Sequence, residues 1–87
     1  MSEDEIVLKF SEIVLNVLGQ PFELLGLNEN LRESRGADSM DMVDILEATE
    51  LAFGIDAGDG SYEKMVNVGQ AVSLIKKLIE SSRQSGR

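Results

Sequence analysis

The sequence predicts an all-α fold: a small four-helix bundle with three main helices and a short third helix, and a long crossover loop between helices 1 and 2. Apolar residues recur at helical spacing in three separate segments, and no segment alternates as a half-buried strand does. A chain of 87 residues can close one hydrophobic core. We therefore expect one domain over residues 1–80 and a flexible polar tail over residues 81–87.

The first helix is expected over residues 3–18. Ser2 and Glu5 have the spacing of a capping box, in which each side chain bonds the backbone N–H of the other. Gly19 and Pro21 then favour an end to the helix. The apolar positions that define its face are Ile6, Phe10, Ile13, Val14 and Val17.

Residues 20–37 show no sustained period, yet they are too apolar for a solvated linker. A structureless segment of this length is uncommon in a compact domain. Two interpretations stay open: an ordered crossover that places its leucines in the core, with a turn of helix near 22–25, or helix boundaries that differ from those assigned here.

The second helix has the clearest boundaries, from Ser39 to Phe53. Asp38 can cap its start, and Gly54 suits the left-handed residue that follows a helix end. Three glycines between residues 54 and 60 weaken the start of the short third helix, which is expected through Tyr62–Met65.

A second capping box predicts the start of the last helix, because Asn67 precedes Val68 and Gln70 lies three residues after Asn67. One helical face of this segment is apolar. Its members are Val68, Ala71, Val72, Ile75, Leu78 and Ile79.

The helix at 39–53 carries two different faces. The first is expected to face the core and comprises Met42, Ile45, Leu46, Thr49, Ala52 and Phe53. The opposite one, here called the acidic face, comprises Met40, Val43, Asp44, Glu47 and Leu51. Eight acids and no Lys or Arg lie between residues 38 and 63. Acids of one sign around apolar anchors favour docking to a basic partner, although plain solubilising charge is the alternative.

Composition excludes several functions. The net charge of −8 repels nucleic acid and anionic membranes, so neither is expected as a partner. The chain has no His and no Cys, which removes the commonest general base and the usual transition-metal ligands. We expect no enzyme activity and no dedicated metal site, only weak nonspecific divalent binding by the acids. The acidic N-terminus is unlike a secretory signal and predicts a cytoplasmic protein, or the mature form of an organellar one.

Ser39 is the candidate site of chemistry. It occupies the first turn of its helix, where free backbone N–H groups and the positive end of the dipole favour phosphate. No base is available to make it a hydrolytic nucleophile, so another enzyme must modify it. The plainer interpretation is that Ser39 belongs only to the capping region of the helix.

The segment Gly36-Ala37-Asp38-Ser39-Met40-Asp41 resembles the attachment motif of the acyl carrier proteins, with Met40 in place of the usual Leu. The resemblance continues over roughly residues 3–80, which makes this an acyl-carrier-like domain. The segments that carry it are Val43-Asp44, Phe53-Gly54-Ile55, Glu63-Lys64 and Val68-Gly69.

The resemblance implies that Ser39 receives 4′-phosphopantetheine from coenzyme A through a phosphopantetheinyl transferase (carrier-protein synthase). The monomeric carrier would then hold acyl intermediates as thioesters between enzymes of fatty-acid, lipid or polyketide synthesis. Asp38 and Met40 would dock the modifying enzyme. Basic patches of acyl-transferring and acyl-modifying enzymes would meet Met40, Asp41, Val43, Asp44, Glu47, Glu50 and Leu51. The bundle interior would shelter part of the acyl chain.

Some positions depart from the family pattern. Ser34-Arg35 stands where an Asp-Leu pair is usual, which is expected to lose an apolar core contact and to put positive charge close to Ser39. Glu47 stands where a partner-facing Met is common. These differences favour a specialised carrier. Two alternative functions stay open. One is an acidic helical adaptor or inhibitor that binds a basic partner without modification, and the other is a carrier-like accessory subunit of a larger assembly.

Overall fold

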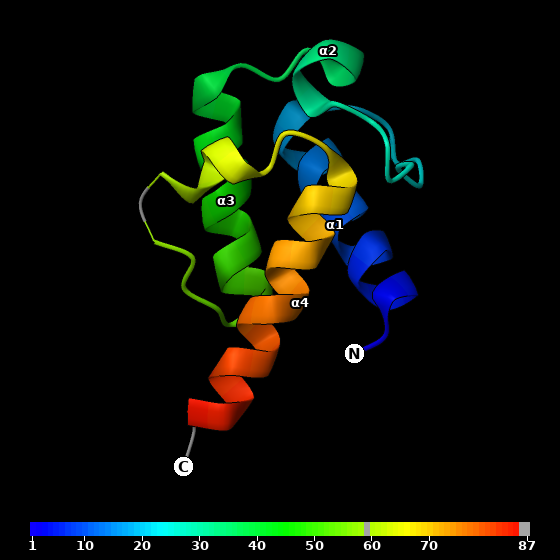
Figure 1. Ribbon diagram of the computed structural model, residues 1–87. Helices are drawn as coiled ribbons and strands as arrows, with labels where there is room; N and C mark the ends of the chain where they lie inside the picture. The colour runs from blue at the N-terminus through cyan, green and yellow to red at the C-terminus, as the bar shows by residue number, and fades with distance from the viewer. Residues whose placement is uncertain (59, 86–87) are drawn as a thin grey trace.

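The computed structural model describes residues 1–58 and 60–85 and consists of helices joined by loops (Figure 1). The elements are α1 (Glu3–Leu18), α2 (Leu31–Arg35), α3 (Ser39–Phe53), the 3₁₀ helix η1 (Ser61–Lys64) and α4 (Val68–Ser85). Within these ranges the only β pairing is an isolated bridge between Asn30 and Asn67. The predicted all-α bundle is confirmed.

The three long helices begin where their local sequence directs them, and α1 and α3 also end where it directs. Capping boxes form between Ser2 and Glu5 and between Asp38 and Asp41. Asn67 Oδ1 accepts from the Gln70 N–H at 2.8 Å, and the Gln70 side chain accepts from the Asn67 N–H. Each box satisfies backbone donors that a helix start otherwise leaves free. Gly54 ends α3 with φ of +66°, a conformation that a Cβ would strain.

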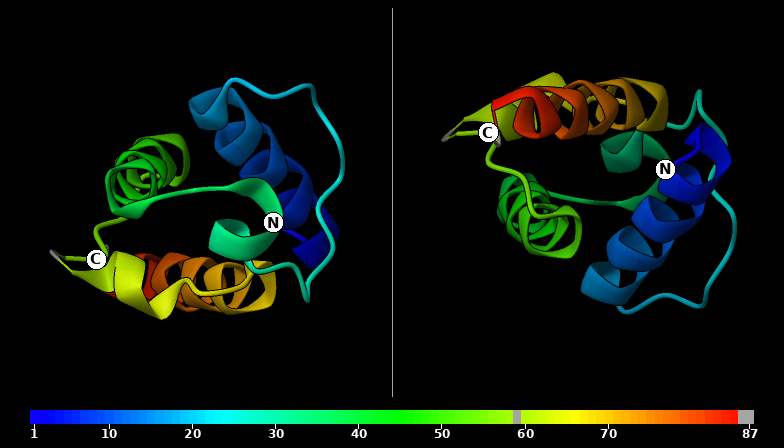
Figure 2. Two further views of the ribbon diagram at one scale, coloured as in Figure 1. Left: turned by 90° about the horizontal axis from the view of Figure 1, so that it is seen from above. Right: turned by 90° about the horizontal axis from the view of Figure 1, so that it is seen from below.

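One hydrophobic core lies between α1, α3 and α4. Figure 2 shows these helices around a shared interior, with α2 across one end. α1 packs against both α3 and α4, and η1 packs against α3. The buried residues include Ile6, Phe10, Val14, Leu15, Leu31, Met42, Ile45, Met65, Val68, Ala71 and Ile75. On α3, Met42, Ile45, Leu46 and Thr49 are buried as predicted, while Ala52 and Phe53 are half-buried.

The crossover is ordered, but its helix is not where the sequence suggested. No helix forms at residues 22–25, because the Leu25 N–H bonds the buried Ser11 Oγ at 3.0 Å instead of a carbonyl one turn earlier. The helical turn is α2, whose start is capped by Asn30 and whose end is the left-handed Gly36. Of the crossover leucines, Leu25 and Leu31 reach the core, whereas Leu24 and Leu27 are exposed.

Two segments hold the crossover, which passes along the outer side of α1 (Figure 2). Ser11 fixes it to α1. The first N–H groups of α4 fix its far end: Val68 donates to the Glu29 carbonyl at 3.0 Å and Gly69 to the Leu27 carbonyl at 2.8 Å. A Cβ on Gly69 would come within 3.2 Å of that Leu27 oxygen, so this position favours glycine. The crossover is therefore an ordered loop, bonded to α1 and α4, that positions α2 next to the start of α3.

The helix α4 continues to Ser85, beyond residue 80. Residues 86 and 87 of the predicted tail lie outside those described. Flexibility over 81–87 stays a prediction from the polar sequence.

Candidate functional site

Ser39 is the first residue of α3 and is exposed at the end of the bundle where α2 lies. The reciprocal bonds between Asp38 and Asp41 fix the backbone on both sides of it. The Asp41 N–H donates to Asp38 Oδ1 at 2.9 Å, and the Asp38 N–H donates to Asp41 Oδ2 at 3.1 Å. The hydroxyl therefore stands at a rigid helix start.

Arg32 of α2 is the side chain that contacts this hydroxyl. Its Nη2 donates to Ser39 Oγ at 3.3 Å. The contact brings together residues seven apart in sequence, because Gly36 turns the chain between α2 and α3. A guanidinium is a donor only, so Arg32 cannot take a proton from the hydroxyl.

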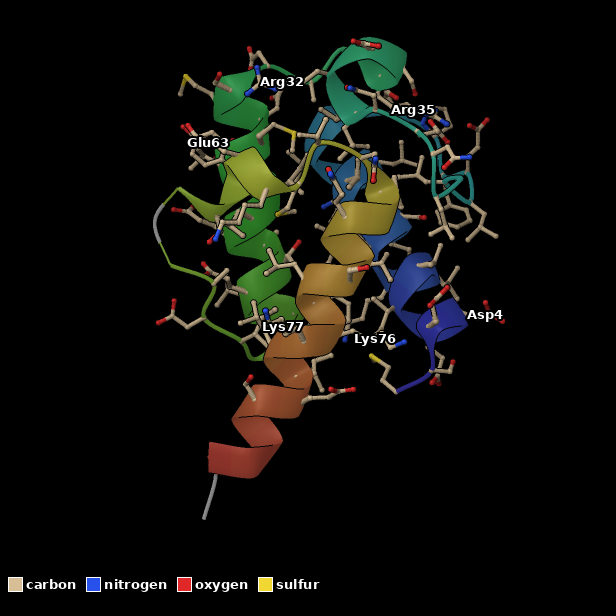
Figure 3. The ribbon with its side chains drawn as sticks, viewed as in Figure 1. Asp4, Arg32, Arg35, Glu63, Lys76 and Lys77 are labelled. Carbon is tan, nitrogen blue, oxygen red and sulfur yellow. The ribbon has the colours of Figure 1, made fainter. Side chains whose placement is uncertain are left out.

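Arg35 does not face Ser39, contrary to the expectation from the sequence. Its Nε donates to Glu29 Oε1 at 3.0 Å, and its Nη2 pairs with Glu23. Figure 3 shows Arg32 and Arg35 on opposite sides of α2. The positive charge beside Ser39 is therefore Arg32, which sequence reasoning missed. The sequence did show a second arginine three residues before Arg35. It did not show which of the two side chains would point toward Ser39.

The hydrogen bonds and ion pairs of Arg35 shift the pKa of Glu29 and of Arg35 itself. Hydrogen bonds from Arg35, then from the Ser34 hydroxyl and the Gly26 N–H, lower the pKa of Glu29 from 4.5 to about 2. The two carboxylates raise the pKa of Arg35 further above its usual range. In place of an apolar contact, Arg35 thus ties α2 to the crossover, and Gln20 Nε2 adds a bond to the Arg35 carbonyl at 3.0 Å.

The acidic face of α3 is open to solvent. Met40 is 76% exposed, Leu51 86% and Val43 37%, and Asp44 and Glu47 are exposed with them. Such exposure of large apolar side chains on one helix is typical of an interaction surface. Below Leu51, an open pocket of about 350 Å³ is lined by Glu47, Glu50, Leu51, Ile55 and Asp56.

Two other predicted partner-binding residues are occupied within the molecule. Asp41 is half-buried and holds the capping box of α3. Glu50 is half-buried, and its Oε2 accepts from the Ala57 N–H at 2.8 Å. Their carboxylates stabilise the ends of α3. The other predicted partner-binding residues are exposed on the surface: Met40, Val43, Asp44, Glu47 and Leu51.

The acids around this face have no cationic partner among the side chains that the structure describes. The ion pairs found there involve Arg35 and Lys76, with Glu23, Glu29 and Glu3. In the same part of the chain, no three His, Cys, Asp or Glu residues are arranged to hold a metal ion. The acidic face is thus a surface of one sign. Arg32, which contacts Ser39 at the start of the same helix, lies near the upper end of α3 in Figure 3.

Comparison with known proteins assigns the family. No family model matches the chain. It is 34% identical to an acyl carrier protein of Guillardia theta over 79 residues, which span 91% of this chain and 98% of that protein. It is 36% identical over 76 residues to acyl carrier proteins of Thermotoga maritima and Prochlorococcus marinus, with 87% of this chain covered and 94% and 95% of theirs.

No helix within the described residues is long and apolar enough to cross a membrane. The helical bundle, the exposed serine at the start of α3 and these relatives agree with one another. The chain belongs to the acyl carrier protein family.

Proposed function

We propose that Ser39 is the attachment site of 4′-phosphopantetheine, and that the protein carries acyl groups as thioesters on that arm between enzymes of fatty-acid, lipid or polyketide synthesis. The observation that supports this most directly is the exposed Ser39 hydroxyl at a rigid helix start, with a guanidinium at 3.3 Å. Family members are carriers rather than enzymes, so the chemistry on the cargo belongs to the partners.

The residues present suit this group. Ser39 supplies an accessible oxygen, and the start of α3 and Arg32 supply positive potential for a phosphodiester. The thiol of the arm would supply the thioester chemistry, which this chain lacks because it has no Cys.

The attachment step needs a base from elsewhere. In the modifying enzyme, Ser39 Oγ would attack the pyrophosphate of coenzyme A at the phosphorus nearer the pantetheine. The Oγ–P bond forms, the P–O bond to the nucleotide breaks, and the hydroxyl proton passes to a base. The Ser39 side-chain contact in the structure is with a donor, Arg32, so the transferase must supply that base.

The acidic face would present the carrier to its partners. Met40, Val43 and Leu51 offer apolar anchors, and Asp44 and Glu47 supply the surrounding charge. Basic patches on a transferase or an acyl-modifying enzyme would complement it, and opposite charge accelerates encounter. We expect docking that weakens with added salt. A sheltered acyl chain, a monomeric state and a cytoplasmic location remain predictions.

Intact mass before and after incubation with coenzyme A and a broad-specificity phosphopantetheinyl transferase tests the proposal. The expected result is a gain of one phosphopantetheine, lost in Ser39→Ala and retained in Ser73→Ala, a matched change at an exposed serine of α4. If the folded protein gains nothing while a control carrier is modified, the attachment proposal is wrong. Binding of a basic partner by Ser39→Ala would then favour the adaptor alternative.

A further inference from the structure

Arg32 differs from Arg35, the other arginine of α2, in what its charge contacts. Arg35 pairs with Glu23 and Glu29. Among the side chains that the structure describes, no carboxylate pairs with Arg32, although the chain carries sixteen acids. Within the same part of the chain, its guanidinium bonds a neutral hydroxyl, that of Ser39. The full charge of Arg32 is therefore available to an anion at this point.

The backbone that carries Arg32 is held on both sides. Asn30 Oδ1 accepts from the N–H groups of Arg32 and Glu33 at 3.0 and 3.1 Å, which fixes the start of α2. The bond from Gln20 Nε2 to the Arg35 carbonyl fixes its end. A guanidinium on an anchored turn loses less conformational freedom when it binds than one on a mobile loop.

The bond to Ser39 is weak in the unmodified protein and would strengthen after modification. A contact at 3.3 Å between a guanidinium and a neutral oxygen is long for this class of bond. A phosphodiester on Oγ would place an anionic oxygen two bonds from the atom that Arg32 already contacts. Bonds from a guanidinium to a phosphate oxygen are shorter and roughly twice as strong as neutral ones.

We propose that Arg32 binds the phosphodiester of the prosthetic group on Ser39 and holds the first part of the arm beside the α2–α3 junction. This inference rests on the proposed attachment at Ser39. It makes Arg32 a positioning residue: it does not react, but it restricts where the arm leaves the bundle. The positive end of the α3 dipole adds partial positive charge at the same helix start.

The test uses the modified protein and two NMR signals that do not depend on any partner's activity. One is the ³¹P resonance of the diester. The other is the side-chain Nε–H resonance of Arg32, compared before and after modification, with that of Arg35 as the internal control. Arg32→Gln removes the charge, Arg32→Lys keeps it without the planar fork, and Lys77→Gln removes an exposed charge on α4 far from Ser39 (Figure 3).

We expect modification to shift the Arg32 Nε–H signal and to leave that of Arg35 in place. Arg32→Gln should move the ³¹P resonance, Arg32→Lys should move it less, and Lys77→Gln should not move it. The difference between wild type and Arg32→Gln should shrink in 1 M salt, where the Debye length is about 3 Å. The wild-type comparison needs no substitution, so it holds even if a variant folds poorly.

Intact mass, measured first on every sample, separates the two proposals. Absence of any mass gain on wild-type protein would overturn the attachment at Ser39 and this inference with it. A full gain with unchanged Arg32 and ³¹P signals would leave the attachment standing and overturn the role of Arg32 alone.

Discussion

Ser11 is a buried hydroxyl on α1 whose oxygen accepts the Leu25 N–H at 3.0 Å. Ser11→Ala would leave that N–H without its partner inside the protein. An unsatisfied buried donor costs about 1–3 kcal/mol, so the free energy of unfolding should fall by that amount. Denaturant unfolding measures it, with Ser73→Ala as the exposed control. Equal stability of the two variants would show that Ser11 does not fix the crossover.

Lys9 on α1 completes the end of α3, whose last turn holds no basic residue. Its Nζ donates to the Ala52 carbonyl at 3.0 Å and lies 5.1 Å from the centroid of the Phe53 ring. Lys9→Met keeps the aliphatic stem but removes the charge, the bond and the cation–π contact. We expect a loss of about 1 kcal/mol in thermal or denaturant unfolding. Lys77→Gln, which removes an exposed charge, should change stability much less.

At the scale of elements, α2 owes its position to Glu29 as well as to its own caps. Because the pKa of Glu29 is lowered from 4.5 to about 2 in the folded protein, its contribution is complete above pH 4.5 and is lost as the pH falls toward 2. Glu29→Gln should therefore be less stable than wild type at pH 7, and the gap should close between pH 4.5 and 2.

Unfolding free energies across that pH range measure the gap. Glu33→Gln, a change on the exposed side of the same short helix, is the control and should follow the wild-type pH dependence. If Glu29→Gln is still less stable than wild type at pH 2, the shape of the Glu29 side chain, and not its charge, stabilises the protein.

The starts of the long helices, and the ends of α1 and α3, could be predicted because each depends on residues three or four apart. The cap at Asp38, the end at Gly54 and the box at Asn67 are local patterns, and the structure confirms them. The position of α2 could not be predicted in the same way. It depends on bonds between distant segments, such as Leu25 with Ser11 and Gly69 with Leu27.

The candidate site shows the same difference between features set by local sequence and features set by distant contacts. The capping residue Asp38 placed Ser39 at a helix start, and periodicity placed the acidic face opposite the core, because both follow from one helix. The direction of the arginines of α2 depends on how the crossover folds back over α1. Closeness in sequence alone led us to expect Arg35 near Ser39, but Arg32 lies there instead.

For the whole molecule, the net charge of −8 opposes the compact state. Glu47 is exposed on the acidic face with no cationic partner among the described residues. Glu47→Gln should raise the melting temperature slightly, by relief of repulsion worth up to about 0.5 kcal/mol, and should weaken docking to a basic partner. Glu80→Gln, near Lys76 and Lys77 in sequence, should not stabilise the protein. A lower melting temperature for Glu47→Gln would contradict the account of repulsion.

The absence of Cys gives a direct test of the carrier role, because any thiol on the modified protein must belong to the arm. The measurement is the number of reactive thiols per chain, by a thiol-specific label and intact mass, before and after incubation with coenzyme A and the transferase. The account predicts none before, one after, and none for Ser39→Ala at any stage. No thiol on the treated wild-type protein, or an equal thiol content in Ser39→Ala, would contradict it.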